Sequence, residues 1–345
     1  MSASASAVSG ATAPPVALRR STRKRSSETT EQEQRVATVA KRARVGKTES
    51  NTPELGALGQ RKWELLEPVE GKFAGGGAGT VQSFARRTGA VDLRRCYHPG
   101  SEAPFAVSRS AIERYIKCPN CFYLQARDNI KPPPGYPLSI NIAVDDLLKK
   151  EFDVYRELGV VHPKVAEAGL DLKPFQHDDM DIWRNNFKGV RCHYEPTNMT
   201  IFGAIDDVWI NKKGELVIVD YKATSKKDAV SLDAQWQDGY KRQMEIYQWI
   251  MRQMGFKVSD TTYFVYCNGD KKMPRFDGKV EFDISLIPFV GDDSWIAETL
   301  AEIKDVLDES EGPESSDCCD LCNYVNDRAE LDAATIVDDS FIDDE

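Results

Sequence analysis

Two stretches rich in Ile, Val, Phe and Trp flank a short polar run that ends in Gly214. This pattern predicts a β-hairpin over residues 199–224, closed by a three-residue loop, 212–214, with the glycine in the left-handed conformation. The register that such a loop imposes places Asp206 directly opposite Asp220. The hairpin is therefore expected to carry two facing carboxylates.

Both faces of the predicted hairpin are apolar. Side chains alternate along a strand, so Lys222 shares a face with Asp206 and Asp220. The other residues on that face are Phe202, Ala204, Val208, Ile210, Leu216 and Ile218, and the opposite face holds Ile201, Ile205, Trp209, Val217, Val219 and Tyr221. A hairpin that is apolar on both sides belongs inside a sheet covered on two sides.

Facing carboxylates need a charge to offset them. Directly opposed residues have Cβ atoms roughly 5 Å apart, and like charges at that distance are destabilising. A hard divalent cation beside Lys222 meets the need, because carboxylate oxygens are its preferred ligands. A buried salt bridge between Asp220 and Lys222, without a metal, is an equally good interpretation of the spacing alone.

The remaining patterns predict helices and strands on both sides of this hairpin. Helices are expected from Ser108, as the N-cap, to Ile116, over 140–158, over 233–254 with Gly255 ending it, and over 295–307, and strands over 190–195, 261–267 and 279–286. Apolar and aromatic residues form a stripe along the 233–254 helix, namely Trp236, Tyr240, Tyr247, Ile250 and Met254. Gln243 lies in the middle of that stripe, where its amide needs a polar partner.

Three of these motifs resemble those of the PD-(D/E)XK nuclease superfamily in its RecB-like branch. Gly203-x-x-Asp206 and Val219-Asp220-Tyr221-Lys222 resemble its motifs II and III, and Gln243-x-x-x-Tyr247 resembles its Q-x-x-x-Y signature. Residues 108–119 are similar to the N-terminal helix of the AddB-type and CRISPR-associated RecB-like exonucleases. The resemblance implies an α/β fold with a restriction-endonuclease-like core, αβββαβ, in which helices flank a central mixed sheet.

The resemblance also implies roles for individual residues. Asp206, Asp220 and the Tyr221 carbonyl would bind one or two Mg²⁺ or Mn²⁺ ions, and Lys222 would orient the attacking water and stabilise the transition state. Gln243 and Tyr247 would position Lys222 or the nucleic acid. The branch usually carries a histidine on the 140–158 helix; here Asp145 stands at that place, with Glu151 as a second candidate.

Cysteines occur near both ends of the predicted core. Cys118 and Cys121 form one C-x-x-C pair, and Cys319 and Cys322 form another, with Cys318 as a substitute. Four thiolates suit structural Zn²⁺ or an iron-sulfur cluster. RecB-like relatives hold a [4Fe-4S] cluster with one cysteine before the core and three after it, whereas this chain has two before and three after. Both cofactors therefore remain open, as a clasp joining the two ends. Cys96, Cys192 and Cys267 are isolated, the last two within strand patterns.

Composition divides the chain into four parts: a disordered basic tail (1–60), a linker (61–103), the nuclease-like domain (104–325) and an acidic, disordered C-terminus (326–345). The net charge is −10, with 45 basic and 55 acidic residues, so DNA is expected to contact a local groove or the tail rather than the whole surface. Basic clusters at 19–25 and 41–44 are typical of a nuclear import signal, a phosphate-binding arm or a solubilising tail. They predict a nuclear location in a eukaryote and a cytoplasmic one otherwise.

The function predicted from these features is metal-dependent hydrolysis of phosphodiester bonds in DNA. The enzyme would be an exonuclease or a structure-specific endonuclease in repair, recombination or defence, with a helicase or repair protein as a partner. No apolar run approaches the roughly 20 residues of a membrane span. The alternatives are a catalytically inactive nuclease fold that binds nucleic acid or supports an assembly, and a zinc-dependent interaction module.

Overall fold

The computed structural model describes residues 96–339. The predicted disordered tail (1–60), the linker as far as residue 95 with its glycine-rich run, and the last six residues lie outside this part. The helices and strands are β1 (Phe105–Ser108), α2 (Arg109–Lys117), α3 (Pro119–Asp128), α4 (Ser139–Leu158), α5 (Pro163–Glu167), β2 (Lys173–Pro174), α6 (Met180–Trp183), β3 (Val190–Tyr194), β4 (Met199–Gly203), β5 (Asp207–Ile210), β6 (Leu216–Thr224), α7 (Asp238–Gln253), β7 (Thr261–Gly269), β8 (Phe282–Val290), α8 (Ile296–Asp308) and α9 (Asp320–Asp339).

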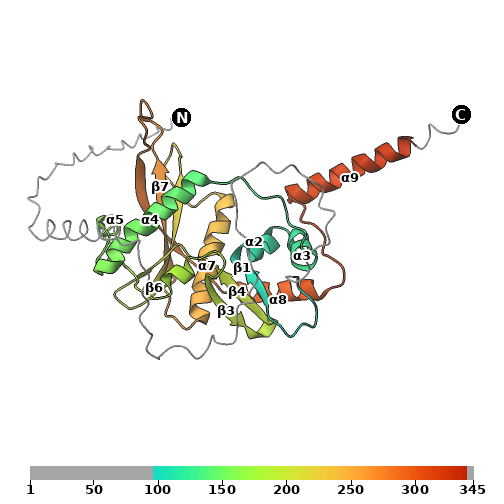
Figure 1. The fold of residues 1–345 in the computed structure, drawn as a ribbon, viewed down its shortest axis with the longest axis horizontal. Helices are drawn as coiled ribbons and strands as arrows, with labels where there is room; N and C mark the ends of the chain where they lie inside the picture. The colour runs from blue at the N-terminus through green and yellow to red at the C-terminus, as the bar shows by residue number, and fades with distance from the viewer. Residues whose placement is uncertain (1–95, 340–345) are drawn as a thin grey trace, which may run out of the picture. The chain divides into compact units, whose positions relative to one another are not determined.

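The strands form two sheets (Figure 1). The larger sheet has the order β2-β5-β6-β7-β8, and it is mixed because β6 and β7 are parallel while the other neighbours are antiparallel. The smaller sheet has the order β1-β4-β3. Strand β6 lies at the centre of the larger sheet, with β5 and β7 as its hydrogen-bonded neighbours. This arrangement confirms the predicted mixed sheet.

The predicted hairpin register is confirmed for β5 and β6. Asp207 pairs with Val219 and Ile210 pairs with Leu216, as the three-residue loop requires. The loop closes with a hydrogen bond of 3.1 Å from the Asn211 N–H to the Glu215 carbonyl. Gly214 has φ of +71°, the left-handed conformation that favours glycine.

The prediction of one continuous strand over 199–210 is wrong, because the chain breaks between Gly203 and Asp207. Strand β4 belongs to the smaller sheet, and only β5 pairs with β6. Ile201 and Ile205 therefore pack in the same core as Val208 and Ile218, not with Trp209 as expected. A residue pattern of period two cannot reveal that a strand changes sheets in its middle.

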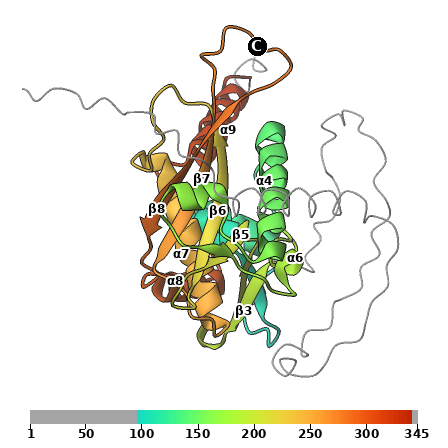
Figure 2. The same cartoon turned by 90° about the vertical axis from the view of Figure 1, so that its left-hand side faces the viewer.

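Helices cover both faces of the larger sheet. Figure 2 shows α4 on one side of β6 and α7 on the other. The core under α7 contains Met244, Tyr247, Ile250, Val208 and Ile218, and the core under α4 contains Leu148, Phe152, Trp209, Val217 and Val219. Helix α7 ends in a Schellman motif, with Phe256 N–H bonded to Met251 O and Gly255 N–H bonded to Arg252 O. Both apolar faces of the hairpin are thus buried, as predicted.

The C-terminal elements differ from expectation in two places. Strand β8 spans Phe282–Val290 rather than 279–286; Pro288 is tolerated inside it because β8 is an edge strand. Helix α9 continues to Asp339, although disorder was expected from residue 326. Its Ala, Leu and Glu residues favour a helix, and Arg328 pairs with Asp332 one turn later. Across residues 96–339, no helix has both the length and the apolar character needed to cross a bilayer.

The first two helices pack against the end of the core. Ser108 caps α2 by accepting the Ala111 N–H at 3.2 Å, as predicted. Asn120 of α3 donates to the Pro313 carbonyl at 2.7 Å, and Arg127 donates to the Leu307 and Glu309 carbonyls at the end of α8. Segments far apart in the sequence are therefore held together beside the cysteines.

Candidate active site

Asp220 is the buried centre of a polar cluster between β6 and α7. Its side chain is 1% exposed, and its carboxylate accepts a hydrogen bond of 2.7 Å from the Gln243 amide. Lys222 forms an ion pair with the other carboxylate oxygen. Burial, followed by the charge of Asp206, raises the pKa of Asp220 to about 7, although Lys222 opposes this shift. Asp220 is thus the polar partner that the Gln243 amide needs within the apolar stripe of α7.

Asp206 lies at the break between β4 and β5. The predicted pairing of Asp206 with Asp220 is wrong, because the ladder begins at Asp207. The Asp206 carboxylate instead accepts a hydrogen bond of 3.0 Å from the Tyr221 N–H. This contact aims the carboxylate at the β6 segment that carries Asp220 and Lys222. Glycine is required at position 203, just before the break, since a Cβ there would lie 2.7 Å from the Tyr247 ring. The Gly203-x-x-Asp206 motif therefore supplies both a glycine that lets Tyr247 pack closely and a carboxylate.

Asp145 of α4 reaches the same cluster from the opposite direction. It accepts a hydrogen bond of 2.6 Å from Lys149, one turn later, and Lys149 is also 3.3 Å from Asp206. Burial and then the charge of Asp206 raise the pKa of Asp145. Its Oδ1 atom is buried and has no hydrogen-bond partner within residues 96–339. A third carboxylate with an unused oxygen thus faces Asp206.

Lys222 is held as an ammonium. Burial alone would lower its pKa, but the charges of Asp220 and Asp206 raise it above the usual value. The Nζ atom also lies 4.6 Å from the centre of the Tyr240 ring, a cation–π contact. Lys222 therefore presents a fixed positive charge beside two carboxylates.

Tyr247 packs next to this cluster rather than inside it. Its ring lies against Gly203. Burial raises the pKa of its hydroxyl to about 12, and Arg109 opposes the shift. The side chain keeps its proton near neutral pH and can only donate or accept hydrogen bonds.

The structure brings together most of the residues selected from the sequence. Asp145, Asp206, Asp220, Lys222 and Gln243 are linked by direct contacts, either to one another or through Lys149. Glu151 is not at the site, because it bonds to His162 at 2.8 Å.

Two neighbours of the cluster were missed. Lys149 could have been found from its spacing of four residues after Asp145, which puts both on one helix face. Arg109 had no signal in the sequence, since only the fold brings α2 to Tyr247.

A second ionic network supports the site from behind the sheet. Asp207, which is fully buried, accepts hydrogen bonds from Arg156, Arg184, Trp209 and the Tyr221 hydroxyl. Arg184 also donates to the Asp206 carbonyl at 2.9 Å. Because Arg156 belongs to α4, the network ties the helix of Asp145 to the strand that follows Asp206.

The four predicted cysteines form a separate cluster. The ligand atoms of Cys118, Cys121, Cys319 and Cys322 all lie within 4.8 Å of one another, with neighbouring sulfurs 3.4 and 3.7 Å apart. Although burial opposes it, hydrogen bonds from the backbone of Cys121 and Ser316 lower the pKa of Cys118 to about 7. Cys318 is exposed and contacts Ser316 instead. The predicted clasp between the two ends is thus confirmed as a four-thiol site.

The match to a known protein family agrees with this geometry. The family model described as PD-(D/E)XK nuclease superfamily matches residues 143–326, a segment that includes Asp145, Asp206, Asp220, Lys222 and Gln243. No curated protein matches the chain in sequence. Among solved structures, one titled "Crystal structure of SSO0001" has 15% identity and a TM-score of 0.27, with 62% of this chain and 80% of that chain covered.

Proposed function

Because the chain belongs to the PD-(D/E)XK nuclease superfamily, we propose that it is a metal-dependent nuclease that hydrolyses phosphodiester bonds of DNA. The observation that carries the proposal is the convergence of Asp206, Asp220 and Lys222 with Asp145 from the facing helix. A purely structural salt bridge needs one carboxylate for each lysine. Here three carboxylates face two lysines, and only Asp220 among these acids is fully buried. A divalent cation would favour the charged forms of Asp145 and Asp220, whose pKa values are raised.

The donor set fits a hard divalent cation. All available donors are carboxylate oxygens, the ligands that suit Mg²⁺ and Mn²⁺, and the buried Oδ1 of Asp145 lacks a partner among the described residues. Asp145, Asp206 and Asp220 would hold the ion, with the Tyr221 carbonyl as a further proposed ligand. Such an ion would polarise the scissile phosphate and lower the pKa of a bound water.

The chain's own residues have distinct proposed roles. Lys222 stabilises the negative charge that develops on the phosphate, because its ammonium is fixed before the reaction begins. Gln243 holds one oxygen of Asp220, so the other oxygen keeps its direction. Arg109, half-buried at the edge of the cluster beside the Tyr247 hydroxyl, is proposed to contact the nucleic acid, and the buried Tyr247 is proposed to position it.

The test is cleavage of a labelled DNA in the presence of Mg²⁺ or Mn²⁺. Asp220→Ala is expected to abolish cleavage while the protein stays folded, as judged by circular dichroism. Asp178→Ala is the matched control, since Asp178 is exposed and belongs to neither cluster. Equal cleavage by wild type and Asp220→Ala would refute the proposal, and would favour a nuclease fold that only binds nucleic acid or supports an assembly.

We further propose that the cysteine cluster holds one structural Zn²⁺. Four sulfurs around a single ion at about 2.3 Å lie roughly 3.8 Å apart at the corners of a tetrahedron. The four sulfurs here lie within 4.8 Å of one another, with separations of 3.4 and 3.7 Å between neighbours. A [4Fe-4S] cluster binds each thiolate to a different iron and spreads the sulfurs further. Zinc at this place would fasten the start of α3 to the start of α9.

The cellular role is proposed at a coarser level. A DNA nuclease of this kind fits repair, recombination or defence, with a helicase or repair protein as a partner. The basic clusters at 19–25 and 41–44 remain a proposed nuclear import signal for a eukaryotic source, with a cytoplasmic location otherwise.

A further inference from the structure

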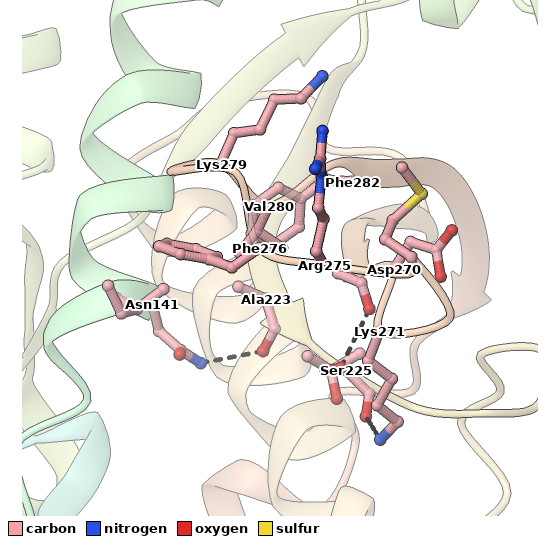
Figure 3. Close-up of a pocket in the computed structure, with 14 residues that line it drawn as sticks. Asn141, Ala223, Ser225, Asp270, Lys271, Arg275, Phe276, Lys279, Val280 and Phe282 are labelled. Carbon is pink, nitrogen blue, oxygen red and sulfur yellow. Dashed lines mark hydrogen bonds between the residues drawn. The ribbon is translucent and has the colours of Figure 1, made fainter.

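A pocket of about 660 Å³ opens at the end of β6. Three segments form it, as Figure 3 shows: the start of α4, the end of β6 and the connection between β7 and β8. Its lining includes Asn141, Ala223, Arg275, Phe276 and Lys279. None of these residues belongs to the carboxylate cluster or to the cysteine cluster.

The pocket adjoins the candidate active site along the chain, on both β6 and α4, although no residue of the carboxylate cluster lines it. Ala223 directly follows Lys222 on β6, and Asn141 lies one turn before Asp145 on α4. The Asn141 amide donates to the Ala223 carbonyl at 2.9 Å, so the two walls are tied together at this point. A DNA strand that leaves the carboxylate cluster along the ends of β6 and α4 would reach the pocket.

The walls combine an open aromatic ring with positive charges. Phe276 is 69% exposed, so most of its ring is open to a ligand. Figure 3 shows the charged ends of Arg275 and Lys279 pointing to the same side of the pocket. Each pairs with an acid, Asp277 and Glu281 respectively, but exposed pairs contribute little energy, so they hold the two cations only weakly.

We propose that this pocket binds unpaired nucleotides of the DNA strand that is cut. Bases stack on an exposed aromatic ring while cations follow the phosphates, a combination suited to single strands. A duplex keeps its bases stacked inside and cannot place one against Phe276. The inference rests on the proposed function, because it assumes that the bound DNA strand runs from the carboxylate cluster into the pocket.

The test measures binding without cleavage. Fluorescence anisotropy of a labelled oligothymidylate, and of a blunt duplex of equal length, is recorded for the full chain without added divalent cation. Phe276→Ala is expected to weaken binding of the single strand about tenfold and to leave duplex binding unchanged. The control is Phe187→Ala, because Phe187 is 89% exposed and does not line the pocket.

A second variant measures the contribution of the two positive charges apart from that of the Phe276 ring. Arg275→Ala with Lys279→Ala is expected to reduce the dependence of log K on log salt by about 0.7 for each phosphate that these two side chains neutralise. Single-strand binding that is the same in wild type and Phe276→Ala, or duplex binding that falls equally, would overturn the inference. Because the assay needs no hydrolysis, this failure differs from a failure of the proposed nuclease, which the Asp220→Ala cleavage assay reports.

Discussion

The Gln243 amide of α7 donates a hydrogen bond of 2.7 Å to Asp220 of β6. We predict that Gln243→Ala weakens Mn²⁺ binding by about 10- to 100-fold, since groups that orient a metal ligand typically contribute this much. Isothermal titration with Mn²⁺ checks the prediction. The matched control is Gln253→Ala, an exposed position on the same helix, which should bind Mn²⁺ as wild type does. Equal affinities in all three proteins would show that the contact does not organise a metal ligand.

Lys149 places its ammonium between Asp145 and Asp206. A divalent ion at these carboxylates must work against that charge, so Lys149→Met is expected to tighten Mn²⁺ binding by about tenfold. This corresponds to about 1.4 kcal/mol, well within the interaction of two charges near 4 Å at a protein surface. Lys150→Met, one residue away and exposed, controls for the removal of a positive charge. Weaker binding in Lys149→Met would mean that the lysine supports the site rather than competing with the ion.

The raised pKa of Asp220 predicts a pH dependence of stability in the absence of Mg²⁺ and Mn²⁺. Burial, followed by the charge of Asp206, moves this pKa from 3.8 to about 7 in the folded chain. Between these two values the folded chain binds more protons than the unfolded chain, so this group's contribution to stability falls as pH rises from about 4 to about 7 and is constant above that.

Thermal unfolding midpoints, recorded from about pH 4 to about pH 8, measure this contribution. Asp220→Asn removes the titrating group, so the difference in midpoint between variant and wild type should grow across the window and then level off. A difference that does not change with pH would contradict a raised pKa. Metal affinity should rise over the same window, since the ion and the proton compete for one carboxylate.

Metal content tests the cysteine cluster. Protein purified without oxygen is expected to contain about one zinc per chain and to show no visible absorption band of an iron-sulfur cluster. Cys319→Ser should lose the zinc. Cys318→Ser should retain it, because Cys318 bonds to Ser316 and is not one of the four clustered sulfurs. Iron and inorganic sulfide in the purified protein would instead support a [4Fe-4S] cluster.

The parts of the fold that were predicted correctly depend on residues close together in the sequence. Gly214 and the loop length determined how β5 and β6 pair. The unsatisfied amide of Gln243 pointed to a polar partner, and Asp220 is that partner. The break after Gly203 followed no local rule, and the close contact of Gly203 with the Tyr247 ring comes from a distant helix. The network around Asp207 was missed for the same reason, since Arg156 and Arg184 reach it from other elements.

The most direct test of the account is the rate of Mg²⁺-dependent DNA hydrolysis by Lys222→Met, measured beside wild type and Lys150→Met. Lys222 is proposed to stabilise charge on the phosphate without binding the metal itself. We predict a rate about 10² to 10³ times lower than wild type, with Mn²⁺ still bound, and a normal rate for Lys150→Met. Hydrolysis by Lys222→Met at the wild-type rate would contradict it.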